Sequence, residues 1–599
     1  MIADLRALYR LLEPRQRRRL LWLQCLIVLM ALGEIVSVVA VAQFMALIGN
    51  PGRLTSGEGR MAWLYQLSGS ASPEAFLLLM GGGALAALVL AGACSGYTTW
   101  RLSLYGAQIG AELSSRLYRD FLHRPWLFHV RHSSSRLMHK TSQEVQRLTQ
   151  RIVIPCLQLN ARLVLVVFMT TMVFLYNPWV ALTGLAIFVG AYLLLYRTVR
   201  KALTATGKRV SRHQAERYQL MSEGFGGIRE LLLWHRQGPY VQRFEAASHK
   251  VARGQGVCQG LGEAPRYAIE LLAFGSVILL VLYLLGRHDG EASHILPALS
   301  VYALAGFKML PAFQRIYVNV AHIRGNLAAF EVLREDLAAS RDAPPPVSEE
   351  PSVRPLVPAV AIELEEVSFR YPRAAEAALS GVSLRIPANH MVGLVGASGS
   401  GKSTLVDILL GLLTPDAGRV TIDGVPLDAA RLRRWQEGIG FVPQQIFLTE
   451  GSIRENVAFG MARDAIDEAR VLEAVRMAQL DELVASLPDG LDSHVGERGV
   501  QLSGGQRQRI GIARALYRRA GVLVFDEATS ALDGVTERQV MADIQRFAGQ
   551  MTVVLIAHRL GTVRHCDTIY MLDHGRLVDA GDFDGLASRN ATFRLMADL

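Results

Sequence analysis

The first half of this 599-residue chain contains six apolar runs, each about as long as a membrane span. They occupy residues 20–48, 76–100, 153–176, 179–196, 265–286 and 294–313. An α-helix needs roughly 20 mainly apolar residues to cross the hydrocarbon core of a bilayer. The sequence therefore predicts a polytopic α-helical membrane domain with six spans.

Positively charged residues predict the orientation of these spans, because Lys and Arg concentrate on the cytoplasmic side of membrane proteins. They are dense in the N-terminal segment and in two long connections, 101–152 and 197–264. Both termini and both long connections are therefore expected in the cytoplasm. The connections are polar with few helix breakers, so we expect helical extensions that project about 30 Å for every ~20 residues. They should turn back at 123–134 and 222–231, which carry Pro and Gly.

Charge and cysteine usage exclude two other classes of protein. The formal net charge is +10, but the basic residues lie beside the apolar runs, so membrane topology explains them and no nucleic-acid partner is expected. The five cysteines have no close spacing, which is not the pattern of a zinc site or of a disulfide framework.

A domain boundary follows the last apolar run. Proline and charge dominate residues 342–358, as is typical of an extended linker. Beyond it, short apolar strands alternate with helical patterns, which indicates a parallel α/β sheet. We expect a membrane domain over 1–337, a linker over 338–358 and an α/β P-loop NTPase domain over 359–599.

The motif GASGSGKST at 396–404 is the strongest chemical signal in the chain. It follows a β-rich run, precedes a helical pattern and fits G-x-x-x-x-G-K-[ST]. Backbone N–H groups of such a loop cradle phosphates, while Lys402 reaches the outer phosphates and Ser403 holds Mg²⁺. The residues expected to line the nucleotide are Gly396, Ser398, Gly399, Ser400, Gly401, Lys402, Ser403 and Thr404.

A second strand, VLVFDE at 522–527, ends in two adjacent carboxylates. Such a pair is often only the start of a helix, but here it follows a P-loop at a suitable distance. Asp526 is expected to hold Mg²⁺, directly or through water, and Glu527 to orient and deprotonate the attacking water.

Further motifs resemble the ATP-binding cassette (ABC) transporters: LSGGQ at 502–506, VPQ ending at Gln444, SALD ending at Asp533 and IAHR with His558. The resemblance implies that Gln444 touches the metal and couples the site to the membrane, and that His558 contacts the γ-phosphate. It implies adenine stacking for Tyr371 and a place for Asp533 among the nucleotide-binding residues. The implied cofactors are ATP and Mg²⁺.

The same resemblance implies a homodimer with two equivalent ATP sites. A cassette's own LSGGQ is far from its own P-loop, so Ser503, Gly504, Gly505 and Gln506 are expected to meet the nucleotide of a second copy. The two turns resemble the helices that couple the cassette to the membrane domain in this family; they lie at 123–134 and 222–231.

A membrane domain placed before the cassette, with paired helical extensions, is similar to the exporter branch. Stretches in the first, fifth and sixth runs and at 224–236 resemble flippases for lipid-linked oligosaccharides. The expected substrate is therefore a polyprenyl-diphosphate-linked oligosaccharide, flipped across the bacterial inner membrane. The alternatives are a multidrug or lipid A exporter of the same fold, a siderophore importer with the exporter fold, and a membrane-anchored ATPase that transports nothing.

Arg266 and Glu270 interrupt the fifth apolar run. We expect Arg101, Arg266 and Arg315 to share the cytoplasmic-leaflet depth and to form a basic ring that captures the diphosphate of a lipid-linked anion. The simpler interpretation is snorkelling to headgroups, with Glu270 neutralising Arg266. Lys308 lies two turns further into the bilayer, where snorkelling explains it poorly.

The connection between the first two runs contains RMAWLYQLSG at 60–69. Met61, Leu64 and Tyr65 have the spacing of one apolar helix face, which predicts a short helix in the outer membrane interface. A disordered loop is the alternative.

Overall fold

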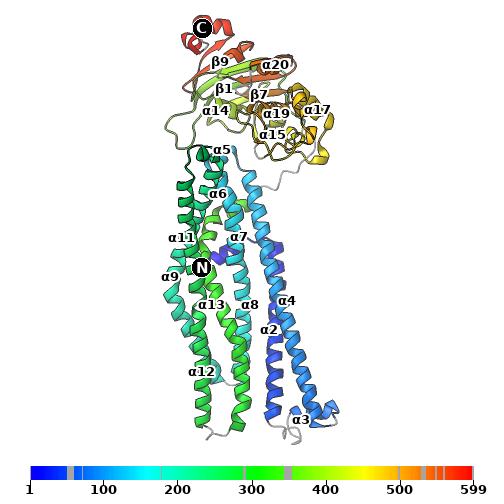
Figure 1. The fold of residues 1–599 in the computed structure, drawn as a ribbon, viewed down its shortest axis with the longest axis vertical. Coiled ribbons are helices and arrows are strands. Elements are labelled where there is room, and N and C mark those ends of the chain that lie inside the picture. The colour runs from blue at the N-terminus through cyan, green and yellow to red at the C-terminus, as the bar shows by residue number, and fades with distance from the viewer. Residues whose placement is uncertain are drawn as a thin grey trace. The chain divides into compact units, whose positions relative to one another are not determined.

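The computed structural model describes residues 2–49, 60–70, 72–176, 178–287, 292–342, 354–496, 499–527, 534–546, 549–557 and 560–596. The chain divides into two compact units, one of residues 1–124 and 128–346 and the other of residues 125–127 and 347–599. The first is helical and the second combines helices with two sheets (Figure 1). The predicted fold classes are therefore confirmed.

Long helices make up the helical unit: α2 (Pro14–Gly49), α4 (Pro73–Leu122), α8 (Ile154–Tyr176), α9 (Pro178–Gly226), α11 (Gln237–Glu263), α12 (Pro265–Arg287) and α13 (Ala292–Asp342). Short helices accompany them: α1 (Ile2–Arg10), α3 (Arg60–Ser68), α5 (Trp126–Arg131), α6 (Ser134–His139), α7 (Val145–Leu148) and α10 (Ile228–Leu233). Two π-helical turns, Lys140–Glu144 and Thr149–Val153, link α6, α7 and α8.

Within the described residues, four helical segments are long and apolar enough to cross a membrane: Pro14–Ile48, Pro73–Leu122, Ser134–Leu175 and Ala181–Gly226. They cover the first two predicted runs completely and the third and fourth except for residues 176, 179 and 180 at their edges. The fifth and sixth runs fall in α12 and α13, which are outside this set of four.

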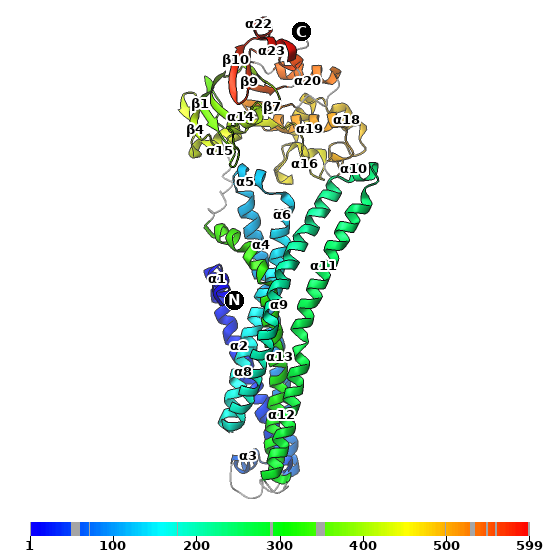
Figure 2. The ribbon, with the colours of Figure 1, turned by 90° about the vertical axis from the view of Figure 1, so that its left-hand side faces the viewer.

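The predicted helical extensions are present. Helix α4 has 50 residues and α9 has 49, so each continues from an apolar run into the first part of the polar connection that follows it. The first extension ends at His123, just before Pro125, and the second gives way at Gly227 to the short helix α10. Helices α9 and α11 then lie side by side in both views (Figures 1 and 2).

Close helix packing in this unit depends on small residues. Gly207 of α9 faces the carbonyl of Gly325 on α13, and a Cβ at Gly207 would overlap that oxygen. The main hydrophobic core includes Ile27 of α2, Leu113 of α4 and Phe330 of α13, all 2% exposed or less. Thus α2, α4 and α13 share one core.

The α/β unit contains two sheets. A six-stranded sheet has the order β10 (Arg576–Gly581), β9 (Thr568–Asp573), β3 (Met391–Val395), β8 (Thr552–Ile556), β7 (Val522–Asp526), β6 (Ile439–Val442). It is parallel except for β10, as the sequence predicts. An antiparallel sheet has the order β2 (Leu379–Pro387), β1 (Ala361–Phe369), β4 (Ala417–Ile422), β5 (Val425–Pro426) and was not predicted. In β1 and β2 buried side chains largely alternate with more exposed ones, the pattern of a sheet packed on one face.

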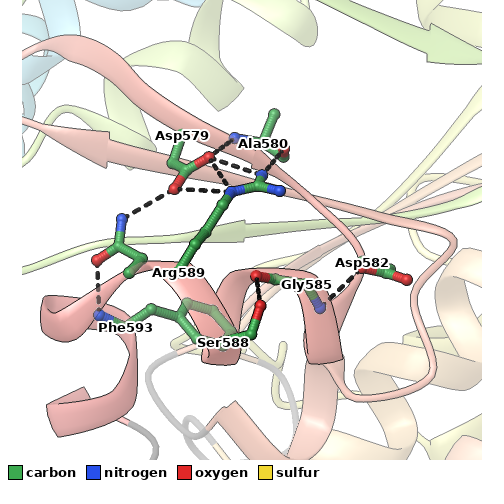
Figure 3. A network of polar contacts seen from close by, with 8 residues as sticks. Asp579, Ala580, Asp582, Gly585, Ser588, Arg589 and Phe593 are labelled. Atoms are coloured by element: carbon green, nitrogen blue, oxygen red, sulfur yellow. Dashed lines mark hydrogen bonds and ion pairs between the residues drawn. The ribbon is translucent and has the colours of Figure 1, made fainter.

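Helices flank these sheets: α14 (Lys402–Leu409), α15 (Ala429–Glu437), α16 (Ile453–Val457), α17 (Glu468–Met477), α18 (Asp481–Ser486), α19 (Gly504–Tyr517), α20 (Gly534–Arg546), α21 (Leu560–Val563), α22 (Phe583–Arg589) and α23 (Ala591–Met596). At the C-terminal end, Arg589 Nη2 donates to Asp579 Oδ1 at 2.8 Å and to the Ala580 carbonyl at 2.6 Å (Figure 3). This contact fastens α22 to β10.

Residues 125–127 fold as part of the α/β unit. Trp126 Nε1 donates to Asp407 Oδ2 at 3.3 Å, and Leu127 packs against a core cluster of the same unit. Asp407 lies on α14, the helix that follows the P-loop. The first of the two turns predicted from the sequence therefore contributes side chains to the unit that carries the nucleotide motifs.

Candidate functional site

The P-loop joins the end of β3 to the start of α14, which is the predicted strand–loop–helix context. Gly396, Gly399 and Gly401 have φ values of 151°, 81° and 100°, a region that side-chain-bearing residues rarely adopt. A Cβ at Gly396 would also overlap the Leu572 carbonyl. The loop therefore needs glycine for conformation and for close approach, and its backbone can wrap a phosphate.

Lys402 begins α14, and only 6% of it is exposed. Its Nζ donates to the carbonyls of Gly396 and Ala397, at 2.8 and 2.9 Å. Burial lowers the pKa of Lys402, and the carboxylates of Glu527 and Asp526 oppose that shift. The ammonium group thus points into its own loop.

Gln444 and Glu527 meet at the carboxyl ends of two adjacent parallel strands. Gln444 follows β6, and Asp526 is the last residue of the neighbouring strand β7. Gln444 Nε2 donates to Glu527 Oε2 at 2.6 Å, while the Glu527 N–H donates to the Ile556 carbonyl at 3.1 Å. The structure therefore brings together two residues that sequence analysis places in one site.

The oxygen donors of this region suit Mg²⁺. Ser403 supplies a hydroxyl, Asp526 a carboxylate and Gln444 an amide oxygen, and Mg²⁺ prefers hard oxygen ligands shared with nucleotide phosphates. The described residues contain no cluster of three or more His, Cys, Asp or Glu side chains able to hold a metal ion by themselves.

Helix α19 begins inside LSGGQ. Ser503 is its N-cap: the Ser503 side chain accepts from the Gln506 N–H at 3.2 Å, and the Ser503 N–H donates to Gln506 Oε1 at 2.8 Å. Of the predicted phosphate donors, Ser503 is therefore engaged by Gln506. Gly504 and Gly505 lie in the first helical turn, where N–H groups have no carbonyl partner within the helix and can face an anion.

Tyr371 lies next to the start of α14. Its hydroxyl is 3.4 Å from Thr404 Oγ1, and its ring packs edge-on against Phe369 with 5.0 Å between centroids. The ring is half-buried near the P-loop. This position is compatible with stacking on adenine and also with a purely structural role in packing. His558 and Asp533 lie outside the described residues.

In the helical unit, Arg266 is paired within its own helix. Arg266 Nε donates to Glu270 Oε1 at 2.7 Å, and Gln314 Nε2 of α13 donates to the same oxygen at 3.0 Å. Glu270 therefore neutralises Arg266, as the simpler interpretation of the fifth run describes.

Lys308 also has a protein partner, one that sequence analysis missed. Lys308 Nζ of α13 lies 2.8 Å from Glu34 Oε2 of α2, and Ser95 Oγ of α4 donates to Glu34 Oε1 at 2.7 Å. Glu34 could have been recognised from the sequence, because a carboxylate in the middle of an apolar run usually has a function.

Arg315 lies near a second overlooked residue, Arg162 of α8. The charge of Arg315 acts on Arg162 unfavourably, and the carboxylate of Glu34 acts on Arg162 favourably. Among the described residues no carboxylate forms an ion pair with either arginine. Arg101 lies instead in a pocket lined by residues of α2 and α4. The structure thus brings Arg315 together with Arg162, while Arg101 and Arg266 have other surroundings.

Comparisons with known proteins agree with this division of the chain. Residues 379–530 match the family model described as ABC transporter, and residues 26–305 match the ABC transporter transmembrane region. The chain is similar to the ATP-dependent lipid A-core flippase of Chromobacterium violaceum, with 30% identity over 85% of both proteins. It is 32% identical to that of Ralstonia nicotianae, over 83% of both.

A solved structure of a bacterial Atm1-family ABC exporter with ATP bound has a similar fold. The TM-score is 0.77, and the match covers 97% of each chain at 23% identity. At this identity the likeness concerns the fold alone, including the order of helical and α/β parts.

Proposed function

The chain belongs to the ABC transporter family, and on this premise we propose that it is a homodimeric flippase for a phosphorylated glycolipid of the lipid A-core type. As a member of the family it is a membrane protein that couples hydrolysis of ATP, with Mg²⁺, to transport. Lipid A-core flippases at 30–32% identity favour this substrate over a polyprenyl-diphosphate-linked oligosaccharide. We propose the inner membrane as its location, with both termini in the cytoplasm.

The observation that carries the anionic substrate is the Arg162–Arg315 pair. The charges of Arg162 and Arg315 repel each other, and an arginine near the middle of a span costs about 2.5–3.5 kcal/mol to insert. A phosphate offsets both costs, because guanidinium groups donate to two phosphate oxygens at once. A neutral drug does not, and this disfavours a multidrug exporter.

We also propose roles for the nucleotide-site residues, within an ATPase domain that begins near residue 359. ATP and Mg²⁺ supply the transferable phosphoryl group and the charge that neutralises it. Lys402 exchanges its loop carbonyls for phosphate oxygens, Ser403 and Asp526 hold Mg²⁺, and Glu527 accepts the proton of the attacking water. Gln444 would contribute its amide oxygen to Mg²⁺, which would require its hydrogen bond to Glu527 to break.

The second half of each site comes from the other copy in this proposal. Gly504 and Gly505 present N–H groups to the γ-phosphate across the dimer interface, and Ser503 joins them when its N–H leaves Gln506. Asp533 and His558 keep the roles that the family resemblance implies.

Reconstitution into liposomes tests the substrate. ATPase activity and flipping are measured with lipid A-core lipid and, separately, with a polyprenyl-diphosphate oligosaccharide. We expect stimulation by the first only. Arg162→Ala and Arg315→Ala should each raise the lipid concentration for half-maximal stimulation by about tenfold or more, the scale of one lost charge-assisted contact.

Arg253→Ala is the matched control, because it removes an exposed cation from α11, outside the apolar runs. It should leave stimulation unchanged. Stimulation and flipping with the oligosaccharide lipid alone would show that the lipid A-core assignment is wrong. Unchanged stimulation in both arginine variants would show that the anion binds elsewhere.

A further inference from the structure

A pocket between α2 and α4 has no role in the proposed transport cycle. Its volume is about 440 Å³, and its lining includes Arg19, Trp22 and Leu23 from α2 and Arg101 and Leu104 from α4. Tyr105 forms part of the wall and is held in place, because its hydroxyl donates to the Gln16 carbonyl at 2.7 Å. We call this cavity the α2–α4 pocket.

The pocket carries two positive charges without an acidic partner. Arg19 and Arg101 come from facing helices, and among the described residues no carboxylate forms an ion pair with either side chain. Glu112 of α4 is engaged elsewhere, since it accepts a hydrogen bond from the Gln16 side chain. Two guanidinium groups on one cavity favour an anionic ligand with several oxygens.

The pocket lies at the border between apolar and polar chain. Arg19 directly precedes the apolar run 20–48, and Arg101 directly follows the run 76–100. Trp22 and Trp100 are 55% and 60% exposed, and Tyr97 is exposed next to Trp100. Trp and Tyr concentrate at the level of lipid headgroups, so this depth is that of a phosphate in the leaflet.

We propose that the α2–α4 pocket binds the headgroup of an anionic phospholipid of the surrounding membrane. The phosphate lies between Arg19 and Arg101, and the glycerol and the first chain carbons lie against Leu23, Leu104 and Trp22. The mixed lining suits such an amphiphile, because apolar and cationic groups face the same cavity. This lipid is distinct from the substrate held by Arg162 and Arg315.

Native mass spectrometry of the purified, delipidated full-length protein tests the proposal. Phosphatidylglycerol or phosphatidylcholine is titrated in, and the affinity of the first bound lipid is measured. We expect the wild type to prefer phosphatidylglycerol by about tenfold or more, and the double variant R19A/R101A to lose that preference. R19K/R101K keeps both charges and should retain most of it.

The double variant R15A/R18A is the matched control. It removes two positive charges from the same end of α2, at residues that do not line the pocket. If it loses the preference as fully as R19A/R101A, diffuse surface charge explains the binding and the pocket assignment is wrong. Equal affinity of the wild type for both lipids would also overturn it.

Two further outcomes are decisive. If R19A/R101A does not fold, Arg101→Gln keeps a long polar side chain, and an unchanged lipid preference in that variant overturns the proposal. If lipid A-core lipid displaces phosphatidylglycerol from the wild type and R19A/R101A also loses flipping, the pocket belongs to the substrate path. That result would refute the phospholipid assignment while leaving the proposed flippase function intact.

Discussion

Replacement of Arg514 should uncouple two parts of the ATPase domain. Arg514 lies on α19; its Nε donates to the Asn456 carbonyl at 2.9 Å and its Nη1 to the Phe447 carbonyl at 3.0 Å. Its guanidinium also lies 4.5 Å from the centre of the Phe459 ring. Burial lowers the pKa of Arg514 to about 10, so the group is still charged at neutral pH.

Arg514→Met keeps the approximate volume and removes the donors. Two backbone carbonyls lose their partner, at about 1–3 kcal/mol each, and the contact with the aromatic ring is worth about 1–2 kcal/mol. Relief from burying a charge offsets part of this, so we expect a net loss of about 2–4 kcal/mol. For a domain of this size that corresponds to about 5–15 °C in Tm.

ATPase measurements distinguish a positioning role of Arg514 from a purely stabilising one. Phe447 follows Gln444 by three residues, and α19 begins at the Ser503 cap, so Arg514 ties the loop that carries Gln444 to the LSGGQ helix. Below the unfolding transition, kcat of the full-length ATPase should fall by about tenfold while KM for ATP changes little. Arg514→Lys keeps the charge and can reach one carbonyl, so its loss should be intermediate.

Arg518→Met is the control on the same helix. Arg518 forms a solvent-exposed ion pair with Glu437 at 2.8 Å, and such pairs contribute at most about 1 kcal/mol. The reasoning is refuted if Arg514→Met matches this control in Tm and in kcat. A fall in Tm with unchanged kcat would restrict Arg514 to a structural role.

Three further predictions concern single elements. Glu527→Gln should slow single-turnover hydrolysis by about 10²–10⁴-fold with ATP binding retained, and wild-type turnover would move the general base elsewhere. Deletion of Arg60–Ser68, a helix whose Trp63 side chain is 60% exposed, should impair flipping in liposomes and spare basal ATPase; normal flipping would show that this helix is dispensable for transport. Asp579→Asn should lower Tm at neutral pH. The hydrogen bond from Arg589 is the main cause that lowers the pKa of Asp579. The ionised Asp579 therefore stabilises the fold fully above the ordinary aspartate pKa, and this stabilisation is lost as the pH falls through the lower pKa of the folded state. The Tm difference between variant and wild type should therefore shrink in acid, and a constant difference would contradict this.

The nucleotide motifs were predictable because their geometry is local. A glycine-rich loop between a strand and a helix has one workable backbone path, and the structure has Gly396, Gly399 and Gly401 at positive φ. The contact between Gln444 and Glu527 follows from strand adjacency, since both residues end neighbouring parallel strands. The Ser503 cap was missed although S-x-x-Q is its local signature.

The intramembrane pairings were harder to predict, because they depend on how each helix is rotated about its axis. Arg101 and Arg315 are both at the ends of apolar runs, yet Arg101 faces α2 and Arg315 lies near α8. Successive side chains on a helix point about 100° apart. The limits of an apolar run therefore give the depth of a residue in the membrane but not the direction in which its side chain points. Depth alone suggested a ring, whereas Arg101, Arg266 and Arg315 have three different surroundings in the structure.

The charges of the spans limit how much negative charge the substrate must supply. Lys308 has an anionic partner, as its depth in the membrane requires, and that partner is Glu34 of the first run and not the substrate. Glu270 accounts for Arg266 in the same way, and all four charges are visible in the sequence. Inside the runs, and among the residues that the structure describes, Arg162 of the third run is the cation without an ion-pair partner, and Arg315 just beyond the sixth run acts on it electrostatically. The two positive charges of Arg162 and Arg315 match one phosphate with a charge near −2, so a monophosphate group on a glycolipid is sufficient, and a diphosphate is not required to balance the site.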